Sequence, residues 1–221
     1  MIEWRQSVVT IGLMLFVTLA QAGAGTNLLQ NPGFEESVTI NTVAATGNYL
    51  VLLQRAVDIE QSEALAMPVG WGPNSGDGWL IGTASALRYV TGKPGDAVYA
   101  GTRALWLTSR GHAAVGAGGL KVRAEKLPGE STLVVGRPNR FSVWAKGAGR
   151  LMVYAYTYDV RSGTNIYGVT KVTPGDFVLT PTWTKYEGTI EFTSPEVGLA
   201  VFVIAVVGGQ VTVDDAAFSG E

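Results

Sequence analysis

An aromatic run in the second half of the chain carries the residues best suited to bind a ligand. Within residues 151–158 the tyrosines stand at every second position, as Tyr154, Tyr156 and Tyr158. Successive side chains of a β-strand point to opposite faces, so a strand here gathers the three rings on one face and leaves Val153 on the other. Tyrosine rings stack on the apolar C–H faces of sugar rings. The run therefore predicts an aromatic binding face.

Four further residues can complete a cleft around that face. Trp106 and Tyr167 add aromatic rings, and Arg161 and Asn165 add polar groups that bind hydroxyls. The alternative is that the tyrosines face the core and bond their hydroxyls at its edge. Strand alternation alone does not choose between these two orientations.

Groups that could perform catalysis are scarce. The one histidine, His112, lies in a stretch rich in glycine and alanine that favours a loop, and the chain has no cysteine. Thiol nucleophiles and cysteine-based zinc sites are therefore excluded. The sequence has no nucleophile elbow, no Gly-Lys phosphate loop and no dinucleotide fingerprint. The acids show no spacing that singles out a pair for glycoside hydrolysis. We therefore expect that the protein is not an enzyme. A hydrolase without a recognisable motif is the alternative, in addition to the two binding or structural hypotheses given below.

Charge and composition restrict the partners. The formal net charge is −2, 15% of residues are charged and 47% are hydrophobic. Nucleic-acid binding needs a basic stripe that neutralises phosphates, and this sequence has none. We therefore expect no nucleic-acid partner and a core large enough to fold without disulfides.

The first 22 residues have the pattern of a signal peptide. A polar opening that contains Arg5 precedes an apolar run over residues 8–20, which is shorter than the roughly twenty residues that span a bilayer. Ala20-Gln21-Ala22 then matches the small-x-small pattern that signal peptidase accepts. We expect cleavage after Ala22 and a secreted, extracellular or cell-surface product without a membrane span. A retained anchor is the alternative.

The remaining residues, 23–221, predict a single all-β domain with one helix-like insertion. Residues 49–65 have helical amphipathic spacing and end before Pro68. Most later segments are short, apolar or alternating, as in a sandwich or jelly roll. The clearest predicted strands are residues 104–108, 140–145, 151–158, 184–192, 199–207 and 211–218, with turns expected at the glycines of 116–119, 147–149 and 208–209.

Six segments in order resemble a known family. They are NLLQNPGFE (27–35), GW (70–71), GTRAL (101–105), FSVWAKG (141–147), TWTKY (182–186) and VDDAAF (213–218). Together they resemble carbohydrate-binding modules of the cellulose- and xylan-binding type, families four, nine and twenty-two. The resemblance covers nearly all of residues 23–221. It implies a galactose-binding-like jelly roll of two antiparallel sheets that binds polysaccharide or a cell-surface glycan.

The same resemblance implies a structural calcium ion and a set of core tryptophans. Glu35 and Asp215 match positions of the family's carboxylate ligands, and calcium prefers oxygen ligands of this kind. Trp71, Trp144 and Trp183 match family positions that are usually buried. We expect calcium to tie the first and last strands together.

An insertion departs from the family pattern and leaves a second function open. Residues 43–67 add roughly twenty-five positions between the NPGFE turn and Gly70-Trp71. The first hypothesis is a non-catalytic glycan-binding module. The second is a structural subunit that self-assembles as a homo-oligomer or polymer into a filament, tube, sheath or surface layer, with the insertion and a β-edge as interfaces.

Overall fold

The computed structural model describes residues 26–40, 65–73, 86–126, 132–159 and 161–220, in which all the regular structure is β-strand. The predicted signal peptide lies outside these residues, and so does the helix-like segment except for Leu65, which begins a strand. Within the described parts of the chain, no helix has the length and apolar character that a bilayer crossing demands.

The strands form an all-β jelly-roll sandwich, as the sequence predicts. Their bounds are β1 Ser37–Ile40, β2 Leu65–Pro68, β3 Trp71–Pro73, β4 Ala86–Thr91, β5 Arg103–Arg123, β6 Leu133–Val134, β7 Pro138–Asp159, β8 Asn165–Ile166, β9 Thr170–Thr173, β10 Asp176–Val178, β11 Thr184–Phe192 and β12 Val197–Ser219.

Strands β1 and β2 pair with each other, and the other ten form one hydrogen-bonded sheet. Its main path is β3-β5-β12-β7-β11-β9, while β4 and β6 pair with β5, and β8 and β10 pair with β7. All these pairings are antiparallel except that of β5 with β6.

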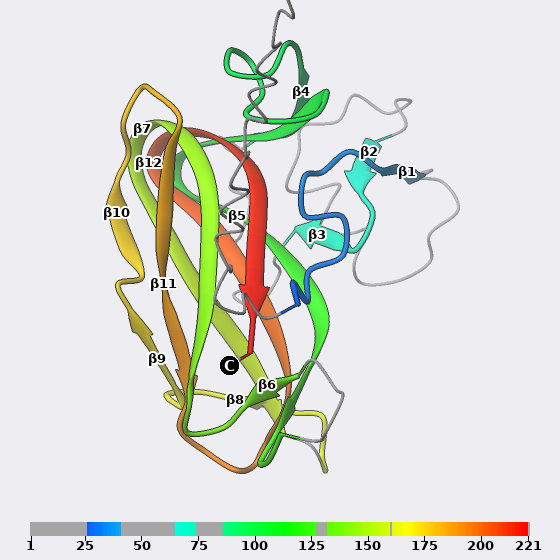
Figure 1. The fold of residues 1–221 in the computed structure, drawn as a ribbon, viewed down its shortest axis with the longest axis vertical. Helices are drawn as coiled ribbons and strands as arrows, with labels where there is room; N and C mark the ends of the chain where they lie inside the picture. Colours follow the sequence, from blue (N-terminus) through cyan, green and yellow to red (C-terminus); the bar gives the residue numbers. More distant parts are fainter. Residues whose placement is uncertain (1–25, 41–64, 74–85, 127–131, 160, 221) are drawn as a thin grey trace, which may run out of the picture.

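The two layers of the sandwich are parts of this one continuous sheet. A straight strand as long as the 22-residue β7 would extend for about 70 Å. Instead β7 and β12 curl over together at one end of the molecule, so that each contributes to both layers (Figure 1). The early half of β7, the late half of β12 and β11 form one layer, and the late half of β7 and the early half of β12 lie in the other.

The expected turns at the glycine clusters are wrong. Residues 116–119, 147–149 and 208–209 lie inside β5, β7 and β12. The two strands predicted on either side of 147–149 are therefore one strand, β7, and the two predicted on either side of 208–209 are one strand, β12. His112 likewise lies in β5 rather than in a loop. The turn prediction is wrong because the glycines of 116–119, 147–149 and 208–209 bend paired strands without ending the pairing. Only β11, residues 184–192, matches its prediction at both ends.

Close approach of β7 and β12 explains why glycine is needed at the bend. A Cβ atom on Gly147 would overlap the carbonyl oxygen of Gln210, and one on Gly209 would overlap that of Ala148. Between Val207 and Gln210, β12 carries one more residue than the facing segment of β7. Such a β-bulge adds curvature to a paired strand.

The core fills the space between the layers. Phe202, Ile204 and Val206 of β12 are fully buried in it, as is Phe218 from the other half of the same strand. The rings of Phe202 and Phe218 stack with centroids 5.0 Å apart. Val203, between these positions, is also fully buried but belongs to a smaller cluster on the opposite face. This part of β12 is therefore covered on both faces.

The first described segment is bonded to the last strand. The Leu28 amide donates to the Phe218 carbonyl at 2.8 Å, and the Ala216 amide donates to the Pro32 carbonyl at 2.9 Å. The predicted turn at residues 31–33 is present, with the Phe34 amide donating to the Asn31 carbonyl at 3.0 Å. The two regions that calcium is expected to tie together thus meet through backbone hydrogen bonds.

The bend generates the first testable prediction. We expect Gly209→Ala to lower the free energy of unfolding by about 2–3 kcal/mol, because its methyl group overlaps a backbone oxygen of β7 that cannot move alone. Urea denaturation followed by tryptophan fluorescence measures this.

Gly118→Ala is the matched control inside β5. Its added Cβ would meet only the Val201 Cγ2 at 3.9 Å, an ordinary contact. We expect this variant to be neutral or slightly stabilising, since alanine is less flexible than glycine in the unfolded chain. Equal stability of the two variants would contradict the role assigned to the bend.

Candidate functional site

The tyrosine run lies on the outer face of one layer. Leu151, Val153 and the other odd-numbered residues of this part of β7 are buried, whereas Tyr154, Tyr156 and Tyr158 are half-buried on the opposite face. The rings of Tyr154 and Tyr156 meet edge to face, with centroids 5.4 Å apart. The tyrosines therefore do not point into the core between the layers.

Aliphatic side chains of the neighbouring strand support these rings. In the register of β7 and β12, Tyr154 is opposite Val203, Tyr156 opposite Val201 and Tyr158 opposite Leu199. Tyr154 and Tyr156 pack on a small buried cluster of Ala114, Val203 and Ala205, and Val201 packs on the same cluster. Leu199 is 43% exposed. This face therefore combines aliphatic side chains of β12 with the phenol rings of β7.

Two more predicted residues extend this face at the Tyr158 end. Asn165 in β8 is the direct partner of Tyr158, so their side chains share a face. The Asn165 amide nitrogen lies 3.5 Å from the Tyr167 hydroxyl, and Tyr167 is 70% exposed. We call Tyr154, Tyr156, Tyr158, Asn165 and Tyr167 the tyrosine stripe.

Arg161 lies in the turn that connects β7 to β8. The Asp159 carboxylate accepts hydrogen bonds from the backbone amides of Arg161 and Ser162, each at 2.7 Å. These bonds, first from Ser162 and then from Arg161, hold the pKa of Asp159 below its ordinary value. The exposed Arg161 is therefore presented from an ordered turn next to the stripe.

Trp106 does not join the stripe. It lies on β5, opposite Thr212 of β12, and Thr212 is opposite Lys146 of β7. These residues belong to the other side of the bend, where Trp106 lines an open pocket of ≈ 290 Å³. The sequence could not show this, because alternation along one strand does not say which residues of another strand lie beside it.

The expected burial of the three tryptophans is correct only for Trp71. Trp71 is 6% exposed and packs on Phe34, with ring centroids 4.9 Å apart. Trp144 and Trp183 are instead half-buried. The alternation of β7 contained the necessary signal, because Trp144 shares its face with Lys146 and not with the buried Val143.

Trp144 and Trp183 form an aromatic cluster with Tyr99. The rings of Tyr99 and Trp144 stack with centroids 3.9 Å apart and planes 12° from parallel, and Trp183 meets Tyr99 edge-on at 6.0 Å. Tyr99 comes from the loop of residues 92–102, which joins β4 to β5. Sequence reasoning missed Tyr99 because nothing local indicates where this loop packs.

Two carboxylates bind the 92–102 loop and the start of β5. Glu35 accepts hydrogen bonds from the Thr102 amide at 2.8 Å, the Thr102 hydroxyl at 2.7 Å and the Arg103 amide at 3.2 Å. Asp214 accepts from the amides of Tyr99 and Ala100 at 2.9 and 3.0 Å. The loop that carries Tyr99 is therefore anchored to both ends of the described chain.

The aspartate that anchors this loop together with Glu35 is Asp214. The neighbouring Asp215 is the one that the family resemblance indicates as a calcium ligand. Asp214 is fully buried, whereas Asp215 is exposed and has a φ of 43°. A register shift between Asp214 and Ala217 marks a bulge there, and aspartate tolerates the left-handed conformation that the bulge requires. Two adjacent aspartates look equivalent in the sequence, but the bulge turns them to different environments.

The residues do not form an open calcium site as arranged. Both oxygens of Glu35 and both of Asp214 accept hydrogen bonds from N–H or O–H groups, and the Asp215 amide is one of these donors. Among the described residues, no group of three or more acidic, histidine or cysteine side chains could hold a metal. Calcium needs six to eight oxygens. Calcium binding therefore stays a prediction of the sequence resemblance.

The two carboxyl groups titrate in opposite directions. Partial burial alone would raise the pKa of Glu35, but hydrogen bonds from Thr102 and Arg103 outweigh it and hold the pKa below its ordinary value of 4.5. Burial raises the pKa of Asp214 above its ordinary value of 3.8, and the hydrogen bonds from Ala100, Asp215 and Tyr99 offset this only in part. The ionised Glu35 thus stabilises the folded state, whereas burial of Asp214 opposes its ionisation.

No family model and no curated protein matches the chain. Solved structures to which it is similar include the CBM22-1 xylan-binding domain of Paenibacillus barcinonensis Xyn10C, at 14% identity and TM-score 0.43, over 68% of this chain and 85% of that one. TmCBM61 in complex with beta-1,4-galactotriose is similar at 15% identity and TM-score 0.40, over 88% of this chain and 99% of that one.

A third similar structure contains a module joined to an enzyme. It comprises the CBM22-1 and GH10 modules of the Clostridium thermocellum endo-1,4-beta-D-xylanase 10B, complexed with xylohexaose. The identity is 14% and the TM-score 0.42, over 69% of this chain and 26% of that one. At such identities and TM-scores the similarity says nothing about what this chain binds, so its own residues must carry the functional argument.

The anchoring of the loop generates a pH-dependent prediction. We expect Glu35→Gln to lower the free energy of unfolding at pH 7 by about 1 kcal/mol, a value kept small because the carboxylate is exposed. Since the pKa of Glu35 is lowered on folding, its contribution is complete above pH 4.5 and disappears as the pH falls through the folded value. The difference between wild type and variant should shrink accordingly.

Urea titrations between pH 3 and 7, in EDTA, measure this difference. The hydrogen bonds from Thr102 and Arg103 need no metal, so we expect the deficit of the variant to persist in the chelator. A deficit that arises only when calcium is added would show that Glu35 acts as a metal ligand instead.

Proposed function

We propose that this chain is an exported, non-catalytic module that binds polysaccharide through the tyrosine stripe. The observation that carries the proposal is the division of β7 into a buried face and a tyrosine face, with Tyr154, Tyr156 and Tyr158 half-buried on the outer side of the sandwich. A buried tyrosine ladder would contribute only to the core. An outward ladder can also contribute its rings to a binding surface.

The shape of the stripe suits a chain of sugars better than a single ring. From Tyr154 to Tyr158 the strand advances by about 13 Å, and Asn165 and Tyr167 widen the surface beside the Tyr158 end. Aliphatic side chains of β12 line one side of the rings. Apolar sugar faces can rest on the rings while hydroxyls bond to the tyrosine, asparagine and Arg161 side chains.

Binding through such a surface requires no reactive group. The described residues that surround the stripe supply rings, an amide and a guanidinium, all of which hold a ligand by stacking and hydrogen bonds. The sequence pattern of residues 1–22 supports export to the compartment where polysaccharides occur.

Tyr156→Ala tests the stripe. We expect at least a tenfold loss of affinity for the preferred polysaccharide, equivalent to about 1.4 kcal/mol, because the variant removes the central stacking ring. Affinity electrophoresis in gels that contain cellulose, xylan, β-glucan or mannan measures the loss. Tyr156→Phe keeps the ring and should retain most of the affinity.

Lys171→Ala provides a control on β9, an exposed position in the layer that does not carry the stripe. Near-ultraviolet circular dichroism establishes whether each variant keeps its native packing. If the wild-type protein is retarded by none of the four polysaccharides, or if Tyr156→Ala migrates like wild type, binding through the stripe is refuted.

The alternative is a structural subunit that assembles into a filament, tube, sheath or surface layer. It is favoured by strand β10, which pairs with β7 and whose Val178 is 79% exposed. Exposed strands of this kind can pair with a second copy of the chain. Sedimentation velocity over a wide concentration range tests this reading: assembly that Val178→Lys abolishes would support it, and a monomer at every concentration would remove it.

A further inference from the structure

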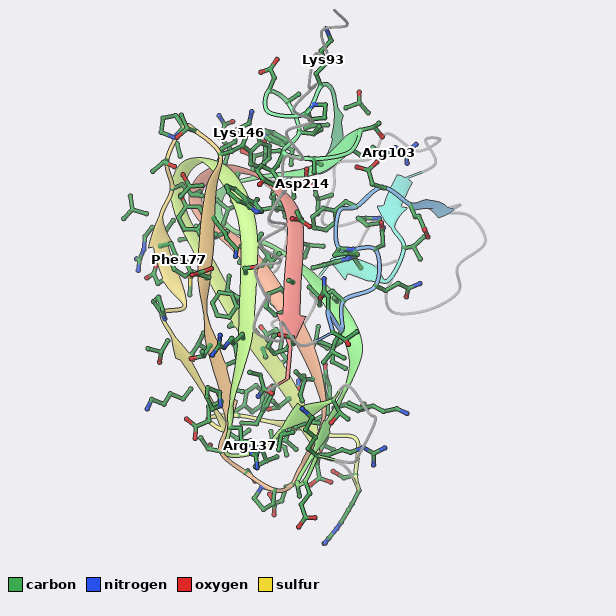
Figure 2. The ribbon with its side chains drawn as sticks, in the orientation of Figure 1. Lys93, Arg103, Arg137, Lys146, Phe177 and Asp214 are labelled. Atoms are coloured by element: carbon green, nitrogen blue, oxygen red, sulfur yellow. The ribbon has the colours of Figure 1, made fainter. Side chains whose placement is uncertain are left out.

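A row of three residues crosses the sheet at the bend. Trp106 of β5, Thr212 of β12 and Lys146 of β7 are direct partners in the two registers, so their side chains share one face. Together they line the pocket of ≈ 290 Å³, which Gln210, Pro181 and the Gly147–Ala148 backbone complete. In Figure 2, Lys146 and Asp214 lie near one end of the sandwich and Arg137 lies at the other.

The lining offers a complete set of contacts for one small polar ligand. The Trp106 indole supplies an apolar ring, Gln210 an amide, and Thr212 a hydroxyl. The pocket has about the smallest volume usual for a small-molecule site, which suits one ring rather than a chain. This distinguishes it from the longer tyrosine stripe.

The charge of the lining selects among such ligands. Its described residues include one cation, Lys146, and no carboxylate. The nearby Asp214 is not a lining residue, and its oxygens accept hydrogen bonds from the backbone amides of Tyr99, Ala100 and Asp215. An anionic ligand can therefore approach the Lys146 ammonium without facing a lining carboxylate.

The Lys146 ammonium is held in place before any ligand arrives. Its Nζ donates to the Asp96 carbonyl and lies 4.8 Å from the centre of the Trp183 ring. The Trp183 Nε1 donates to the same carbonyl at 3.0 Å. An ammonium has three N–H donors, of which the carbonyl bond takes one. The aromatic cluster thus orients a cation at the edge of the pocket.

We propose that this pocket binds a single carboxylate-bearing sugar unit, a hexuronate, separately from the tyrosine stripe. The sugar ring packs on Trp106, its hydroxyls bond to Gln210 and Thr212, and its carboxylate pairs with Lys146. Because the stripe and the pocket lie on opposite sides of the bend, the two sites bind independently.

Nuclear magnetic resonance titrations of the full chain test the pocket. The probes are methyl glucuronide and methyl galacturonide, with the neutral methyl glucoside and methyl galactoside for comparison. We expect the uronides to shift the amide signals of Gly147, Ala148 and Gln210 with at least a tenfold lower Kd than the neutral sugars. Added salt should raise the Kd of the uronides.

Two pocket variants and two controls establish which residues act. Lys146→Met should weaken uronide binding at least tenfold, whereas Lys185→Met, which removes a lysine from the neighbouring β11 outside the pocket, should not. Gln210→Ala, at an exposed position, should weaken binding several-fold and decides the matter if Lys146→Met fails to fold. Tyr156→Ala should leave uronide binding unchanged, even if it abolishes polysaccharide binding.

The proposal is overturned if neutral sugars bind as tightly as uronides. It is also overturned if neither folded pocket variant binds more weakly than Lys185→Met, or if the shifted signals belong to the tyrosine stripe alone. Since none of these results depends on retention by a polysaccharide gel, the pocket proposal and the stripe proposal can be refuted separately.

Discussion

The continuous pairing of β7 and β12 through the bend is the constraint on which the rest of the molecule depends. Because the two strands remain hydrogen-bonded as they curl over, both layers inherit one register. That register places Phe202 and Phe218 of the same strand in contact across the core. It also decides which side chains of β7 lie outside, and therefore where every candidate binding group is found. Glycines make this possible because a side chain at Gly147 or Gly209 would occupy space that the facing backbone already fills.

Two carboxylates fix the 92–102 loop, which lies outside the named strands, on the sandwich. Glu35 follows the first turn and Asp214 lies in the last strand, yet both bind backbone amides between Tyr99 and Arg103. The loop in turn brings Tyr99 onto Trp144 and the Asp96 carbonyl to Trp183 and Lys146. Two carboxylates from opposite ends of the described chain thus position an aromatic cluster at one end of the sandwich. A similar task had been expected of calcium.

Much of the tyrosine stripe could be predicted because it depends on a local regularity. Alternation along one strand places Tyr154, Tyr156 and Tyr158 together whatever the fold, and the nearby turn returns Asn165 and Tyr167 to the same face. Trp106 could not be placed in this way. Its neighbours Lys146 and Thr212 come from other strands, and their register follows from the bend. The different environments of Asp214 and Asp215 could not be foreseen for a related reason, since a bulge interrupts the regular alternation of side chains there.

The sequence by itself determined the all-β class and the gathering of the three tyrosines on one face of β7, because side-chain alternation is a property of a single strand. It also contained the turn at Asn31 and the family-like order of segments. Only the tertiary structure decided that glycine clusters bend strands rather than end them, that Asp214 is buried, and that Trp144 and Trp183 are partly exposed beside Lys146. These outcomes depend on how closely distant backbones approach one another, and no short stretch of residues records that distance.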